Sequence, residues 1–444
     1  QSLCARGGAH MSPWNQTTLP GGLPLIWQQR PGPDVVAARL WIRGGSSQDP
    51  QGQRGAHQLL AGLMTRGCGD LDADALADLV EGQGAVLRSE ASEDSLVVSL
   101  KCAAADASTL LPLLLTMVRD PHLSPEQLDL ERQLNLQSLQ RQREDPFQLA
   151  HDLLREQLYG QGPYGHDPLG VEAELATLDR DALLPLFAGL GATGALLVLT
   201  GAVAPELTQQ LGDSLAPAPW STRAPEAGPS AQGSTERATT ESISGEGPGG
   251  FGPMEQDTEQ LVVMLGSATV PLGHPDALAL RVLQAHLGMG MSSRLFVVMR
   301  EERGLAYDVG VHMPARMGAT PFIWHLSSSA DRAKEACDCL LEEWQRMVET
   351  PLDSAALALA KAKYIGQDAM GRQTCGQIAD RQALVLGHGL GANYIEATLA
   401  LAHQLTPADL VGAAQRWLKR PALSVCGPGE AITRTSDAWA SWRI

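Results

Sequence analysis

Two residues whose side chains can donate hydrogen bonds to a ligand, Arg300 and Tyr307, stand seven positions apart. A serine pair at 292–293 can cap a helix whose last turn holds Arg300, and Gly304 can take the left-handed conformation that ends it. The chain would then reverse into a strand over residues 305–313, which brings Tyr307 back beside the helix end. A guanidinium and a phenol at one place can donate hydrogen bonds to peptide carbonyl groups.

The spacing alone leaves a second interpretation open for these two side chains. Arg300 could pair with Glu301 or Glu302 on the surface, and Tyr307 could fill one face of a sheet, as strand tyrosines usually do.

A single histidine, His57, lies on a predicted helix that follows a strand and two glycines at 44–45. This segment, together with the sequence R-E-E-R-G-L-A-Y over residues 300–307, resembles the pitrilysin or insulinase family of zinc peptidases, which includes the mitochondrial processing peptidases. The resemblance covers residues 22–427 approximately and is weakest in the middle of the chain.

The family carries an inverted zincin motif, H-x-x-E-H, on this helix, where two His hold zinc and the Glu activates the metal-bound water. Here only His57 matches, because Leu60 stands at the Glu position and Ala61 at the second His. The third ligand of the family, a Glu on a long helix, falls at Ser138, or at Gln137 if the register slips by one. Catalytic zinc needs three protein ligands, so we expect no metal and no zinc catalysis in this chain, and a hydrogen-bonded or relic role for His57.

The resemblance favours a substrate-binding role for the other pair. In the family, an Arg and a Tyr at the spacing of Arg300 and Tyr307 bind the substrate backbone near the scissile carbonyl, where negative charge develops. In two-chain members, one subunit carries H-x-x-E-H and its homologous partner carries the Arg/Tyr pair. The implied function is that of the non-catalytic, substrate-binding subunit of a heterodimeric zinc metalloendopeptidase, with zinc in the partner subunit and unfolded peptides as substrates.

Two alternatives remain open at this point. Degenerate members of the family also serve as structural scaffolds without a proteolytic role. A third possibility is a homodimeric peptide-binding protein that holds extended segments by adding them to a sheet edge.

The elements that position these residues form two similar halves. A segment rich in Pro, Gly, Ser and Thr predicts a linker over 217–252, which separates a domain at 11–216 from a second at 253–444. Residues 1–10 are typical of an expression leader.

The two halves repeat one order of elements. A helix that begins near Leu178 leads to a strand at 195–200, and a helix near Leu405 leads to a strand at 422–426. The fold class predicted is α/β in a sandwich-like α+β arrangement. Each half would hold a mixed, largely antiparallel sheet backed by helices, as the family resemblance implies.

The composition of the chain limits the classes of partner that it can bind. With 33 Lys and Arg against 50 Asp and Glu, the net charge of −17 excludes a nucleic-acid footprint and suits basic peptides as partners. The longest apolar runs are shorter than the ~20 residues of a membrane-spanning helix. The seven cysteines are scattered, without the spacing of a zinc or redox motif, which is typical of reduced thiols in a cytoplasmic protein.

Overall fold

The computed structural model describes residues 13–191, 194–215, 220 and 249–442. The predicted leader and most of the predicted linker lie outside the described residues. Two residues at the linker's predicted end, Phe251 and Gly252, lie in a strand, and Trp220 is buried in the core of the first half.

The first half is built on a six-stranded sheet in the order β1-β2-β8-β3-β7-β6. Its strands are β1 (Asn15–Thr18), β2 (Pro24–Gln29), β3 (Val35–Arg43), β6 (Val86–Ala91), β7 (Ser95–Ala103) and β8 (Ala195–Gly201), with a separate small ladder of β4 (Gly67–Cys68) and β5 (Leu71–Asp72). Its helices are α1 (Ala56–Leu63), α2 (Ala73–Glu81), α3 (Ala107–Arg119), α4 (Pro125–Gln142), α5 (Pro146–Tyr159), α6 (Glu172–Leu175), α7 (Arg180–Gly189) and α8 (Pro205–Leu215), with short 3₁₀ turns η1 (Ser46–Gln48) and η2 (Ala104–Asp106).

The second half repeats this plan around a five-stranded sheet in the order β11-β12-β10-β13-β9. Its strands are β9 (Phe251–Glu255), β10 (Gln260–Ala268), β11 (Asp308–His312), β12 (Pro321–Ser329) and β13 (Ala422–Gly427). Its helices are α10 (Ala277–Gly288), η3 (Phe296–Glu302), α11 (Ala333–Glu349), α12 (Ser354–Met370), α13 (Cys375–Gly387), α14 (Tyr394–Gln404), α15 (Pro407–Trp417) and α16 (Gly429–Ser441), with the 3₁₀ turn η4 (Ala330–Arg332).

The two sheets correspond strand by strand. Read from the parallel pair, β2-β8-β3-β7-β6 matches β9-β13-β10-β12-β11. Among the described strands, β2/β8 and β9/β13 are the parallel pairs. The predicted fold class of two homologous halves, each with a mixed, largely antiparallel sheet backed by helices, is confirmed. The strands predicted at 195–200 and 422–426 are β8 and β13.

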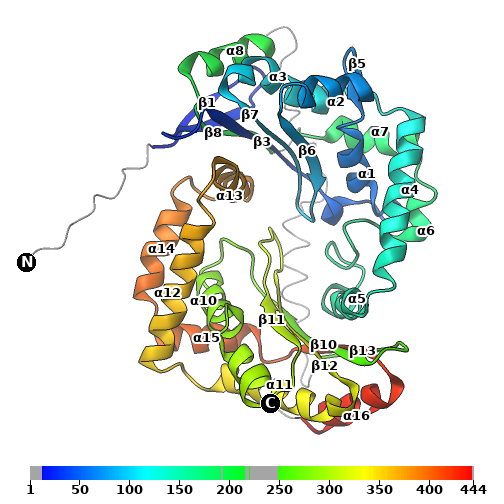
Figure 1. Ribbon diagram of the computed structural model, residues 1–444, viewed down its shortest axis with the longest axis vertical. Helices are drawn as coiled ribbons and strands as arrows, with labels where there is room; N and C mark the ends of the chain where they lie inside the picture. The colour runs from blue at the N-terminus through cyan, green and yellow to red at the C-terminus, as the bar shows by residue number, and fades with distance from the viewer. Residues whose placement is uncertain (1–12, 192–193, 216–219, 221–248, 443–444) are drawn as a thin grey trace, which may run out of the picture.

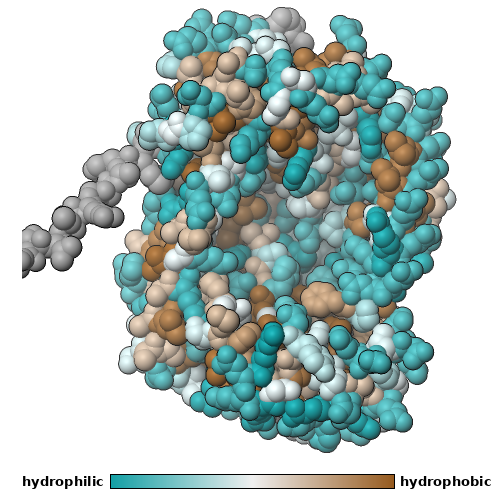
Figure 2. Space-filling view, in the orientation of Figure 1, coloured by the Kyte–Doolittle hydropathy of each residue, from teal (hydrophilic) through white to brown (hydrophobic). Residues whose placement is uncertain are grey.

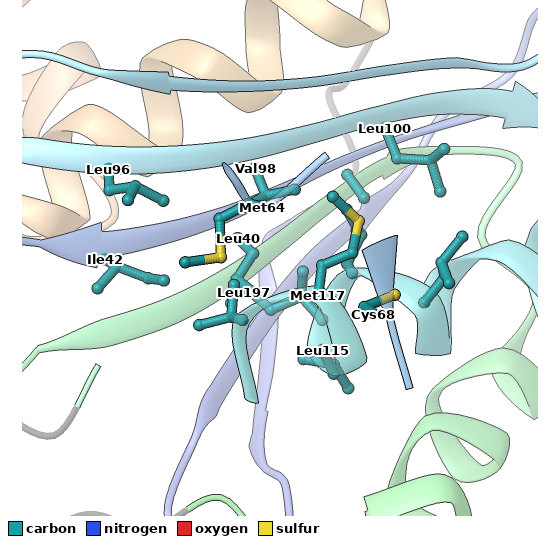
Figure 3. Packing of buried hydrophobic residues seen from close by; sticks show 14 of the residues in the cluster. Leu40, Ile42, Met64, Cys68, Leu96, Val98, Leu100, Leu115, Met117 and Leu197 are labelled. Carbon is teal, nitrogen blue, oxygen red and sulfur yellow. The ribbon is translucent and has the colours of Figure 1, made fainter. Parts of the chain in front are cut away.

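Each half packs its own helices against one face of its sheet. In the first half, Leu40 and Leu197 point from the sheet toward Met64 and Met117, which come from beside α1 and from α3 (Figure 3). The second half has an equivalent core around Trp324 and Trp344, whose rings meet edge to face at a centroid distance of 4.8 Å. These two clusters are the main hydrophobic cores of the molecule.

The other face of each sheet is covered by a helix of the opposite half. The helix α13, from the second half, packs on β3 and β8, whereas α5, from the first half, packs on β10 and β13 (Figure 1). This exchange explains why β8 and β13 are buried along their whole lengths and read as unbroken apolar runs. No helix among the described residues is long and apolar enough to cross a membrane.

Candidate functional site

The helix α1 carries the positions that correspond to the H-x-x-E-H motif. Its residues Leu60 and Ala61 are buried in the first core, and their hydrocarbon side chains carry no atom that could bind a metal or a proton. Ser138, on α4, donates its hydroxyl hydrogen to the carbonyl oxygen of Leu134 one turn earlier, at 2.9 Å. The Gln137 side chain is on the exposed face of α4.

His57 is buried and held by Asp49, a residue of the loop before α1. The Nδ1 hydrogen of the ring is donated to Asp49 Oδ1 at 2.7 Å, and the same carboxylate accepts the amides of His57 and Gly55. Burial would raise the pKa of Asp49, but hydrogen bonds from His166 and His57 and the Gly55 amide outweigh it and keep that pKa below its ordinary value. The predicted hydrogen-bonded role of His57 therefore fits this geometry.

These positions do not suit a zinc ion. One imidazole, two apolar side chains and a serine hydroxyl replace the donor set that catalytic zinc requires. The carboxylate of α4 that faces α1, Glu131, is already paired with Arg66 at 2.7 Å. Within the described ranges, no three His, Cys, Asp or Glu side chains gather in a way that could hold a metal ion.

Arg300 and Tyr307 are brought together at the end of η3. An Nη1 hydrogen of Arg300 is donated to the main-chain carbonyl of Tyr307 at 2.9 Å, and the guanidinium lies 5.2 Å from the ring centroid of Phe296. Arg300 forms no ion pair with a described carboxylate, which argues against the alternative pairing with Glu301 or Glu302. The Tyr307 side chain is 60% exposed, so it does not fill the face of the sheet.

The local backbone differs in part from the expectation. The helix begins with two α-helical residues at 294–295 and continues as the π-helix η3, which the sequence did not predict. Ser293 stands directly before the first helical residue, as expected, and its carbonyl accepts the amide of Val297 at 3.0 Å. Gly304 does adopt a left-handed conformation, with φ at 58°. The strand begins at Asp308 rather than at residue 305, because the amides of Leu305 and Ala306 both bond the carbonyl of Met299.

Further contacts fix this turn. Arg332, beyond β12, donates hydrogen bonds to the carbonyl oxygens of Arg303 and Gly304. The amide of Tyr307 bonds the carbonyl of Ser327 on β12 at 2.9 Å. Sequence reasoning missed both supports, and it also missed Asp49, because partners this distant in sequence leave no local pattern. The arrangement holds a guanidinium and a phenol at the free edge of the second sheet.

Comparison with known proteins identifies the family of this chain. The family model described as insulinase (peptidase family M16) matches residues 25–170, and the model described as the peptidase M16 inactive domain matches residues 195–364. The chain belongs to the M16 peptidase family. The resemblance predicted from the His57 and Arg300–Tyr307 segments is thereby confirmed.

Relatives extend over most of this M16 chain. It is 24% identical over 431 residues to an uncharacterized zinc protease of Streptomyces coelicolor, covering 96% of this chain and 92% of that protein. It is 23% identical over 293 residues to the uncharacterized zinc protease YmxG of Bacillus subtilis, covering 66% of this chain and 68% of YmxG.

Solved structures agree on the fold of the M16 chain. A peptidase M16 inactive domain from Pseudomonas fluorescens superposes with a TM-score of 0.81 at 21% identity, over 94% of this chain and 98% of that one. A protease from Helicobacter pylori superposes with a TM-score of 0.80 at 17% identity, over 94% and 100% of the two chains. At these identities, the likeness shows the shared fold alone.

Proposed function

We propose that this chain is the non-catalytic, substrate-binding subunit of a heterodimeric zinc metalloendopeptidase. The observation that carries the proposal is the contrast between its two halves. On α1, the buried Leu60 and Ala61 stand at the Glu and second His positions of H-x-x-E-H. Arg300 and Tyr307, by contrast, lie at the solvent-exposed end of η3. The homologous partner would carry H-x-x-E-H and supply the zinc ion, the general base and the attacking water.

The role of this chain is to hold the peptide at the reacting centre. The Arg300 guanidinium has donors left after its bond to the Tyr307 carbonyl, and the exposed Tyr307 hydroxyl is a further donor. Both can bind carbonyl oxygens of an extended peptide, and such bonds stabilise the charge that develops during attack on the scissile carbonyl. Neither residue replaces the metal chemistry, which explains why the chain would act only in the pair.

Charge and thiol chemistry support the remaining parts of the proposal. The net charge of −17 favours unfolded peptides rich in Lys and Arg as substrates. The six described cysteines are free thiols, five of them buried, which suits a reducing cytoplasmic compartment.

Reconstitution with an H-x-x-E-H partner tests the proposal. The purified chain alone should show no peptide hydrolysis that a chelator blocks. In the pair, Arg300→Ala and Tyr307→Phe should each lower kcat/KM by ~10²-fold, the scale of losing one transition-state donor. Arg303→Ala is the matched control, since Arg303 lies one residue past η3 and forms an ion pair with the exposed Glu342.

Each alternative has a distinct result. Chelator-sensitive hydrolysis by the chain alone would overturn the proposal. A stable partner complex whose activity is unchanged by both substitutions would favour the scaffold.

The free edges of both sheets favour peptide binding by strand addition as a second candidate function. The strands β6 and β11 are each the last of their sheet, so one side of each has no neighbouring strand among the described residues. A homodimer without a proteolytic partner that binds extended peptides, and loses them when alternate residues are N-methylated, would identify this function instead.

A further inference from the structure

The two halves are joined by two equivalent helix contacts that differ in chemistry. We call the packing of α13 on β3 and β8 the α13 clasp, and the packing of α5 on β10 and β13 the α5 clasp. In the α13 clasp, Ala379 and Ala383 pack against the Trp41 side of the sheet, and Arg39 pairs with Asp380. In the α5 clasp, Ala150 and Leu154 occupy the corresponding apolar position.

The α5 clasp places histidines between helix and sheet along its length, whereas the α13 clasp has His388 at the C-terminal end of its helix, where burial lowers the pKa of that histidine. His151 of α5 lies against His312 of β11, with ring centroids 6.3 Å apart and the ring planes nearly perpendicular. The His325 ring of β12 lies 5.2 Å from the ring centroid of Phe147, on α5, also edge to face. The side chains of His151 and His325 are 20% and 19% exposed, whereas His312 is open to solvent.

His151 is held as a neutral ring. Its Nδ1 accepts a hydrogen bond from Arg155 Nη2 at 3.2 Å, which a protonated imidazole cannot do. Burial, together with the positive charges of Arg155, His312 and Arg316, lowers the pKa of His151 to about 3, with Glu93 opposing them. Burial also lowers the pKa of His325, although Asp308, 3.2 Å from its Nε2, opposes that shift.

The other charged groups around the α5 clasp do not cancel the lowering of the histidine pKa values. Arg316 reaches from the second half to pair with Glu93 of the first at 2.7 Å and stacks on the rings of Tyr159 and Tyr164. Burial raises the pKa of Glu93, but Arg316 lowers it more, so that the pKa falls below the ordinary value of 4.5. Glu93 therefore stays ionised over the pH range in which histidines titrate.

Asp152 is the remaining acid on α5. Burial raises its pKa to about 6, and the groups that modify this shift, Arg155, Asp167 and Gln148, all belong to the first half.

We propose that the α5 clasp is a proton-operated latch, in which acidification protonates His151 and His325 and loosens the packing of α5 on the second sheet. The loosened state weakens the contact between α5 and the strands β11 and β12, which border the Arg300–Tyr307 site. The proposal does not depend on the proposed function, because it concerns the two halves of one chain.

The direction and the size of the pH effect follow from the linkage between proton binding and docking. A histidine whose pKa is lowered in the docked state stabilises docking above its free pKa of 6.5, and this stabilisation is lost as the pH falls below that value. For His151, docking should weaken about 25-fold between pH 7 and pH 5, since each pKa unit corresponds to a factor of ten. This window lies above the range in which Glu93 titrates.

Hydrogen exchange on the full chain at pH 7 and pH 5, corrected for intrinsic rates, tests the latch. Protection in α5, β10 and β13 should fall by about 25-fold at pH 5. Unchanged protection in these elements at pH 5 would overturn the proposal without any variant.

Substitutions then show which histidine takes up the proton. His151→Asn keeps an acceptor for Arg155 and should remove most of the pH dependence, and His325→Gln should remove part of it. The matched control is His122→Asn, because His122 is exposed, bonds the carbonyl of Gly69 and lies outside both clasps. A folded His151→Asn protein whose α5 clasp opens as the wild type does would contradict the assignment.

Discussion

The last residue of α13, Gly387, allows an unusually close approach of that helix to the first sheet. A Cβ added at this position would lie 2.5 Å from Cδ2 and Cζ2 of Trp41, where ordinary carbon contacts are about 3.5–4.0 Å. Trp41 is 2% exposed and packed in β3, so its ring has no room to move. Gly387→Ala should therefore force α13 away from the sheet.

The magnitude comes from two opposing effects. Overpacking a rigid site costs about 1–3 kcal/mol, and replacing glycine by alanine near a helix end recovers less than about 1 kcal/mol. The net loss should be about 1–2 kcal/mol, or a fall in Tm of roughly 2–8 °C for a half of this size. Gly366→Ala is the matched control, because Gly366 is exposed inside α12 and a Cβ there meets nothing within 4 Å.

Thermal unfolding of the two variants beside the wild type gives the comparison. The variants should shift in opposite directions, with Gly366→Ala raising the Tm by up to roughly 4 °C through its better helix propensity. If Gly387→Ala melts at or above the wild-type temperature, the tight contact between α13 and Trp41 is not present in solution.

Three further predictions concern buried charge and metal. Asp380→Ala should cost about 1–3 kcal/mol in urea unfolding, because it strands the 10% exposed Arg39 side chain, and adding Arg39→Met should recover most of the loss. Asp49→Asn should destabilise the protein at pH 7. Since folding lowers the pKa of Asp49, this carboxylate stabilises the fold above its ordinary pKa of 3.8, and the gap in Tm between variant and wild type should close as the pH falls below that value. Elemental analysis should find well under one zinc per purified chain and EDTA should leave the Tm unchanged; one zinc per chain that His57→Ala removes would contradict the ligand assignment.

The repeat and its two sheets could be predicted because they leave local signals. The apolar strands at 195–200 and 422–426 each follow an amphipathic helix, and the same order occurs twice at nearly the same spacing. The turn that joins Arg300 to Tyr307 was equally readable, since Gly304 marks the only position in R-E-E-R-G-L-A-Y that takes a left-handed backbone without strain.

The exchange of helices between the halves could not be predicted. The apolar stripes of α5 and α13 show that each helix covers something, but Ala150 and Ala379 would pack equally well on either sheet. The π-helix was missed for a related reason. It depends on how the amides of Leu305 and Ala306 share the Met299 carbonyl, and this is decided by the packing of β11 on β12 rather than by the residues of the helix.

The reciprocal covering of the sheets has a consequence for biosynthesis. The strands β3 and β8 are complete long before the segment that begins at Cys375 leaves the ribosome, a delay of roughly ten to thirty seconds at ordinary translation rates. During that time the apolar surface around Trp41 and Val198 has no cover of its own. The native cover of that surface therefore forms only after α13 has been synthesised, so the first half completes its packing late in translation.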